Sequence, residues 1–415
     1  MMINPQIAKT IEQLDYRVTV GDVATQSGLN INEAQAGLLT LASDVGAHLQ
    51  VSQSGDIAYL FPRNYRNILR KKYLSLRLQD LWQKIWAVIF YLIRISFGIF
   101  LVISILLIFV TIIIIVIAQS SSDNNDRRSS RSINGGFFPN IWIMPNLSGW
   151  FSPRSRPYQS VRSAQGMNFF EAVFSVLFGD GHPNPNLESK RWQKIGKVIR
   201  KYKGSVIAEQ ILPYLDESTP ITNEDFMIPV LSRFNGYPEV SEQGEIIYRF
   251  PELQTTALNR EPVVVSNTLR EQPWEFSQAS SGQKMLTLGL GILNLGGALV
   301  LSILLRDGTI ALQLGGLVAF VNSILWVLLA YGIGFLAIPL VRYLWIQRRN
   351  QRLEARNDRR ERFAAALRSP DLELRQKLKT AREYQSEDVI IGSDNLAYTT
   401  EQDLLTQELD RLGDS

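Results

Sequence analysis

Three long stretches of the chain carry no charged residue and are mostly apolar. They are Ile95–Ala118, Met285–Leu305 and Ile310–Val341, of 24, 21 and 32 residues. The hydrocarbon core of a bilayer, about 30 Å thick, is crossed by roughly 20 residues of α-helix. The pattern therefore predicts three membrane-spanning helices, and it makes a soluble enzyme a poor fit to the chain.

Two shorter segments repeat one another. Val51–Pro62 reads VSQSGDIAYLFP and Val240–Pro251 reads VSEQGEIIYRFP, with seven of twelve positions identical. In both, apolar and polar residues alternate on either side of a turn that contains glycine, which is typical of a β-hairpin. Neither a membrane span nor a linker accounts for the match, so the sequence predicts two copies of one small domain.

Helical spacing precedes each hairpin. In the first copy the pattern predicts a helix around Ile7 and Ile11, a helix over Val20–Ser27, and a third helix capped by Asn30 or Asn32. Three helices followed by a hairpin is the order of winged-helix domains. The second copy repeats it through Trp192–Arg200, Val206–Leu215, Asn223–Phe234 and Val240–Phe250.

These patterns predict an α-helical membrane protein with two small α+β winged-helix-like domains. Shifts in composition divide the rest of the chain. The predicted parts are 1–62 (first domain copy), 63–84 (basic juxtamembrane helix), 85–118 (first transmembrane helix), 119–166 (partly disordered linker), 167–187 (amphipathic helix and turn), 188–258 (second domain copy), 259–284 (connector), 285–305 and 310–341 (second and third transmembrane helices) and 342–415 (charged helical tail).

The tail and the borders of the spans give three further expectations. Residues 345–384 predict a charged helix broken at Ser369-Pro370, whose basic half either binds anionic lipid head groups or faces solvent. Thr400–Leu412 predicts a short amphipathic helix. Arg94, one residue before the first apolar run, is expected to snorkel to the membrane interface.

The residue counts remove most site chemistries. The chain has no cysteine and only two histidines, His48 and His182. Disulfides, thiolate nucleophiles, cysteine zinc sites and self-ligated iron–sulfur clusters are excluded. The loop Phe178–Asn186 has neither the carboxylates of a calcium loop nor the pattern of a phosphate loop. We therefore predict no enzymatic activity, no catalytic or metal-binding residues and no cofactor.

A winged-helix order invites a DNA-binding function, but the charges argue against it. Residues 1–62 hold two basic residues, Lys9 and Arg17, against six acidic ones, and the candidate recognition helix 31–46 has no Lys or Arg. Phosphate binding depends on such residues. We expect a protein-interaction surface instead, with stable spacer domains as the alternative. Its candidate residues are Glu33, Asp44, Tyr59, Glu224, Asp225 and Tyr248.

The charges beside the spans give conflicting topologies. Residues 63–84 carry seven Lys or Arg and residues 342–362 carry eight, so the positive-inside rule places both in the cytoplasm. Three crossings would place them on opposite sides. A re-entrant or doubled apolar run, or one misplaced charge cluster, would resolve this conflict. The start of the chain lacks an apolar signal segment, and we expect insertion by the internal spans.

Several strings resemble a known group of proteins: Asn168–Asn186, Arg191-Trp192, Ala208–Leu215 and Glu224–Gln254. They are similar to a family of poorly characterised membrane proteins of cyanobacteria and chloroplasts, whose plant relatives are sometimes labelled with iron–sulfur cluster biosynthesis. The similarity covers roughly 168–254, with a similar order of spans around it. It implies a photosynthetic bacterium and a plasma or thylakoid membrane. The absence of cysteine departs from the iron–sulfur label, and no catalytic residue carries over.

The resulting hypothesis is a non-enzymatic, multi-pass membrane scaffold or assembly factor. Its duplicated domains would bind other membrane proteins beside the lipid, in the biogenesis of photosynthetic membrane complexes. A membrane-tethered transcription regulator is the first alternative, although it needs basic surfaces. A small-molecule transporter is the second, although the three apolar runs contain no ionisable residue.

Overall fold

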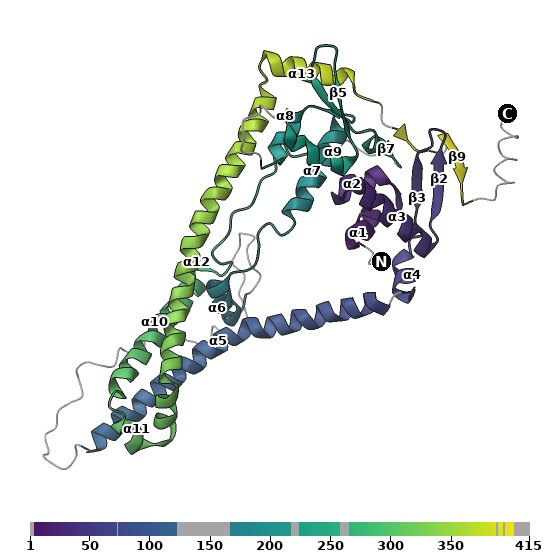
Figure 1. Cartoon of the computed structure of the whole chain (residues 1–415). Coiled ribbons are helices and arrows are strands. Elements are labelled where there is room, and N and C mark those ends of the chain that lie inside the picture. Colours follow the sequence, from purple (N-terminus) through teal and green to yellow (C-terminus); the bar gives the residue numbers. More distant parts are fainter. Residues whose placement is uncertain are drawn as a thin grey trace, which may run out of the picture. The chain divides into compact units, whose positions relative to one another are not determined.

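The computed structural model describes residues 4–72, 74–122, 167–216, 224–257, 265–386, 389–392 and 395–401. The chain forms two compact units. Unit 1 consists of Met1–Leu81, Pro183–Pro273 and Gln351–Ser415, and unit 2 of Trp82–His182 and Trp274–Asn350. The described chain is mostly helical, and its small sheets belong to unit 1 (Figure 1).

The first domain copy starts unit 1 with local signals that define each helix. A capping box between Thr19 and Asp22 begins the second helix, and Gly28, with φ of 74°, ends it. The Asn30 side chain caps the third helix by accepting from the Asn32 backbone N–H. The elements are α1 (Pro5–Gln13), β1 (Arg17–Thr19), α2 (Val20–Ser27), α3 (Ile31–Val45), β2 (His48–Ser52) and β3 (Ile57–Leu60).

The second copy has the same order of elements, with a longer first helix and shorter second and third helices than the first copy. Pro213 lies in a 3-10 turn that follows the short second helix, and Pro229 lies in the first turn of the third helix, where proline's missing N–H leaves no hydrogen bond unmade. The elements are α7 (Leu187–Lys201), β4 (Ser205–Val206), α8 (Ala208–Ile211), η3 (Leu212–Tyr214), η4 (Asp225–Met227), α9 (Ile228–Phe234), β5 (Tyr237–Val240), β6 (Ile246–Arg249), η5 (Pro251–Leu253) and β7 (Thr255–Thr256).

The sheets show that the two copies share one topology. In the first copy the hairpin strand β3 pairs with β1, and in the second β6 pairs with β4, so the orders are β1-β3-β2 and β4-β6-β5. Val18 faces Tyr59, and Val206 faces Tyr248 at the equivalent position. The sequence pattern predicted both hairpins but not their third strands, which are only three and two residues long.

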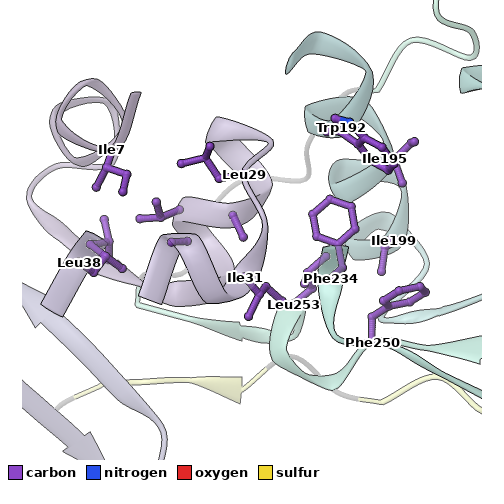
Figure 2. Packing of buried hydrophobic residues seen from close by; sticks show 14 of the residues in the cluster. Ile7, Leu29, Ile31, Leu38, Trp192, Ile195, Ile199, Phe234, Phe250 and Leu253 are labelled. Atoms are coloured by element: carbon purple, nitrogen blue, oxygen red, sulfur yellow. The ribbon is translucent and has the colours of Figure 1, made fainter. Parts of the chain in front are cut away.

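One hydrophobic core joins the two copies. Figure 2 shows Ile7, Leu29 and Leu38 of the first copy and Trp192, Ile195 and Phe234 of the second contributing to the same cluster. Helices α2 and α7 pack closely, because glycines leave room there. A Cβ on Gly28 would lie 2.7 Å from the Ser189 carbonyl oxygen. The copies are therefore one folded body rather than two separate modules.

The end of the chain packs on this body. The predicted break at Ser369-Pro370 is present, since α12 (Gly316–Arg368) ends before it and α13 (Leu372–Glu383) follows. The strand β8 (Val389–Ile390) pairs in parallel with β7, and β9 (Leu396–Thr399) pairs antiparallel with β2. These tail strands were not predicted, and most of the expected helix Thr400–Leu412 lies outside the described residues.

Unit 2 is built around three long apolar helices. They belong to α5 (Leu74–Ser122), α10 (Ser281–Leu304) and α12, and by length and composition each could cross a membrane. The short α11 (Thr309–Leu314) joins α10 to α12, so the predicted third run divides at Gly315. The amphipathic α6 (Phe169–Phe178) packs against α10. Helix α4 (Tyr65–Lys72) precedes α5 in unit 1, and α5 includes the first residues of the predicted linker, the rest of which lies beyond the described ranges.

The directions of these helices bear on the topology conflict. Ser104 contacts Asn294, and Ile108 lies beside Gly297, so α5 and α10 run parallel. Gly291 lies beside Phe335 and Gly332 beside Leu295, so α12 is antiparallel to α10. Within unit 2, the first residues of its α5 segment, from Trp82, and the last residues of its α12 segment, up to Asn350, therefore lie at the same end. This arrangement agrees with the positive-inside rule, which places the basic clusters before α5 and after the apolar part of α12 on the same side of the membrane. Three simple crossings would place the two clusters on opposite sides.

Candidate functional site

Two of the predicted surface residues lie in the core. Tyr59 is 4% and Tyr248 5% exposed, and burial raises the pKa of both phenols. The Tyr248 hydroxyl donates to Glu224. Their inclusion in an interaction surface was wrong, because the hairpin alternation directs both rings toward the shared core.

The four predicted carboxylates lie on the third helical segments of the two copies, and three of them, Glu33, Glu224 and Asp225, lie where those segments begin. Glu33 is exposed in the first turn of α3, and Asp44 is half-exposed near its end. Glu224 and Asp225 lie at the start of η4, the corresponding point of the second copy. The carboxylates thus mark the third helical segment of each copy.

An exposed apolar side chain accompanies each pair of carboxylates. Leu39 is 56% exposed on α3, and Ile228 is 61% exposed at the start of α9. On the roughly 100° spacing of a helix, Glu33 and Asp44 lie together on one edge of the solvent side of α3 and Leu39 lies on the other edge, while Leu38 and Leu41 face the core. We call Glu33, Leu39 and Asp44 the α3 face. Sequence reasoning found its charges but missed its leucine, because α3 is apolar on more than one side.

A buried ion pair holds the two copies together. The carboxylate of Asp22, on α2, is fully buried and lies 2.8 Å from a guanidinium nitrogen of Arg200, on α7. It also accepts hydrogen bonds from the Thr19 and Ala257 backbone N–H groups and from the Thr256 hydroxyl, at 3.0–3.1 Å. The pattern could not reveal this centre, because its partners are 178 positions apart in sequence.

A second buried charge centre lies where α12 meets the second copy within unit 1. Arg360 is 1% exposed and contacts Glu271 at 2.9 Å, Asp216, and the carbonyl oxygens of Leu215 and Leu269. Burial alone would raise the pKa of Glu271, but hydrogen bonds and charges from Arg356 and Arg360 outweigh it and lower that pKa. In both centres the buried charges are paired with one another, and each centre joins elements that are distant in sequence.

A small pocket borders the first copy but offers no evident ligand site. Its volume is about 210 Å³, and its lining includes Asp56, Tyr59 and Glu252. The Asp56 carboxylate already accepts from the hydroxyls of Ser54 and Thr255. Among the described residues, no group of three His, Cys, Asp or Glu side chains could hold a metal ion.

The edge strands of the two sheets, β2 and β5, differ in whether they can hydrogen-bond to a further strand. On β2, the Leu49 N–H donates outward to the Thr400 hydroxyl at 2.8 Å, and the Leu49 carbonyl accepts from the Thr400 N–H at 2.9 Å. The register puts Pro238 at the equivalent position of β5, because Leu49 pairs with Tyr59 and Pro238 with Tyr248. Proline has no N–H to donate, so only the first copy can bind a strand in this way.

In unit 2, polar groups hold α6 in place. Asp180 follows α6, pairs with Arg94 at 2.6 Å and accepts from Ser175. Arg342 donates to the carbonyl oxygens of Val176 and Phe276. Arg94 thus has an acidic partner that the sequence did not reveal, and its snorkelling to the membrane interface stays a prediction.

Over the described residues, these features define a mostly helical chain with three long apolar helices and a duplicated small domain. It is 38% identical to a chloroplastic protein of Arabidopsis thaliana that is described as uncharacterized, over 96% of this chain and 78% of the relative. The chain belongs to the family of this chloroplastic plant protein. The relative's description gives no iron–sulfur role. No family model matches the chain, and no solved structure matches it.

Proposed function

We propose that the protein is a membrane-anchored scaffold, in which unit 2 inserts into the lipid and the two winged-helix-like copies of unit 1 bind protein partners. The α3 face carries this proposal. A large exposed leucine on a helix that also presents two carboxylates and has no Lys or Arg suits a partner that offers both an apolar side chain and basic residues. An exposed apolar side chain with polar neighbours is typical of interfaces.

The anchoring part of the proposal rests on unit 2. Large apolar side chains are exposed along all three long helices, among them Phe100, Ile292 and Trp326. In water each such side chain would cost roughly 1.5–3 kcal/mol relative to an apolar environment. The chloroplastic relative supports a thylakoid or plasma membrane of a photosynthetic organism as the site of insertion. The role that we propose there is the biogenesis of photosynthetic complexes.

The test is co-purification from mild-detergent extracts of the native membranes. We expect discrete protein partners with the wild-type chain and their loss with Leu39→Glu. The matched control is Leu372→Glu on α13, since Leu372 is 77% exposed and lies outside the α3 face. Partners that are retained by Leu39→Glu, or lost equally with Leu372→Glu, would remove α3 as the binding surface.

The shared topology of the copies also favours a second candidate, a membrane-tethered transcription regulator. Helix–strand–helix–helix–hairpin order is compatible with a DNA-reading third helix. The third helix of the first copy, α3, has no basic residue, which argues against DNA binding. Salt-dependent retention of duplex DNA by the full chain, abolished by Leu39→Glu and not by removing charge from α4, would favour the regulator over the scaffold.

A further inference from the structure

Two tryptophans and an arginine, Trp274, Trp345 and Arg349, form a cluster at one end of unit 2. Exposed apolar residues continue along α12 to Leu344 and Trp345. After the buried Ile346 come the polar residues Gln347, Arg348 and Arg349. This change from apolar to polar marks the level at which a membrane-spanning helix leaves the hydrocarbon region. Tryptophan is enriched at that level, where its ring meets the head groups.

The guanidinium of Arg349 lies against two tryptophan rings. Its central carbon is 4.5 Å from the ring centre of Trp274 and 4.8 Å from that of Trp345. The two rings are 5.7 Å apart and nearly perpendicular, at 74°. Attraction between a cation and an aromatic face orients the guanidinium plane. The side chain of Arg349 is therefore held in place by rings rather than by an acid.

The backbone around Trp274 fixes the cluster further. Its N–H donates to the Asn350 side-chain oxygen at 2.8 Å, and its carbonyl oxygen accepts from the Asn350 side-chain nitrogen at 2.9 Å. These two bonds clamp Trp274 to the same helix that carries Trp345 and Arg349. The three side chains thus form one preorganised site.

Arg349 differs from the other well-positioned arginines of unit 2. Arg94 pairs with Asp180, and Arg342 donates to backbone carbonyl oxygens. In the described part of the chain, Arg349 has ring contacts but no carboxylate or carbonyl acceptor. A guanidinium has five N–H donors in a planar fork that matches the oxygens of a phosphate. Its hydrogen-bonding edge remains available to an external anion.

We propose that Trp274, Trp345 and Arg349 bind the phosphodiester head group of an anionic phospholipid. The apolar side chains of Leu344 and Trp345 lie beside the acyl chains, and the Arg349 fork receives the phosphate. A lipid fits better than a soluble phosphate or a phosphopeptide, because the site directly follows the apolar part of α12. The proposal rests on the membrane insertion of unit 2 proposed above.

The test uses the full chain in lipid nanodiscs of phosphatidylcholine alone or mixed with phosphatidylglycerol. After gentle detergent extraction, native mass spectrometry counts the lipids that remain bound. We expect preferential retention of phosphatidylglycerol by the wild type and a loss of about fivefold in that preference with Arg349→Gln. Arg349→Lys keeps the charge but loses the planar fork, so most of the preference should disappear as well.

Arg348→Gln is the matched control, because it removes one exposed charge at the neighbouring position. It should leave most of the preference intact. An equal loss with Arg348→Gln and Arg349→Gln, or equal retention of both lipids by the wild type, would overturn the site. So would displacement of the retained lipid by soluble glycerol phosphate. A chain that fails to enter either nanodisc would instead contradict the membrane anchoring of the proposed function.

Discussion

The ion pair between Asp22 and Arg200 should control how firmly the two domain copies hold together. Replacing Arg200 with Met keeps much of the side chain's length and leaves the Asp22 carboxylate buried without its cation. Removing one partner of a buried ion pair usually costs about 3–5 kcal/mol. Asp22 keeps three hydrogen-bond donors in this variant, so we expect the lower value, about 3 kcal/mol.

Hydrogen exchange followed by mass spectrometry on the full chain in detergent measures this loss locally. A loss of about 3 kcal/mol corresponds to roughly 100-fold faster exchange of protected amides. The acceleration should extend over both α2 and α7, since the ion pair joins them. In the double variant Asp22→Asn and Arg200→Met, the loss should be smaller than the sum of the two single losses, because neutralising Asp22 removes the uncompensated charge.

Lys201→Met is the control, because it removes a neighbouring cation from the same helix at an exposed position. It should change exchange in α2 by less than about twofold, as exposed charges contribute little. The reasoning is refuted if Arg200→Met accelerates exchange only in α7, or if Lys201→Met has an effect of the same size in both helices.

Three further predictions concern the tail, the second charge centre and the apolar unit. Leu49→Pro removes the backbone N–H that binds the Thr400 hydroxyl, so protease cleavage near residues 396–400 should become faster. Pro238→Leu adds an outward N–H to the edge strand β5, so size-exclusion chromatography should show increased self-association. The pKa of Glu271 is lowered in the folded chain. The stabilisation that its carboxylate gives is therefore complete above the ordinary pKa of 4.5 and is lost as the pH falls through the lower pKa of the folded chain. Thermal unfolding measured against pH should show a smaller loss of stability in acid for Glu271→Gln than for the wild type. Ser104 donates to Asn294 at 2.7 Å between α5 and α10, and Ser104→Ala should weaken helix packing in detergent by about 0.6 kcal/mol, measured by unfolding in a denaturing detergent.

Local signals made the first copy the most predictable part of the fold. Gly28 and Gly46 end helices at the predicted positions because a left-handed residue after a helix favours glycine. The hairpins followed from a period of two and a glycine turn. The strands β1 and β4 were missed because three and two residues are too short to show alternation.

Long-range contacts set the limit of sequence reasoning for the site. The tail strand β9 pairs with β2 although the two are more than 300 residues apart in sequence. The spacing of apolar residues within a segment does not indicate which distant strand it pairs with. Nothing in the sequence indicated that Asp22, Arg200 and Arg360 are buried ion-pair residues, because their partners are distant in the chain. Tyr59 and Tyr248 were misplaced for the opposite reason: their polar hydroxyls suggested a surface, although the hairpin period directs both side chains inward.

The most direct test of the central claim is photo-crosslinking from position 39 in native membranes. A photoreactive amino acid in place of Leu39 should yield an adduct with a protein of discrete mass, and the same probe at Leu372 should not. Charge reversal at Glu33 and Asp44 should abolish that adduct if the α3 face recognises a basic partner. No protein adduct from position 39, or an adduct with nucleic acid, would contradict a protein-binding scaffold.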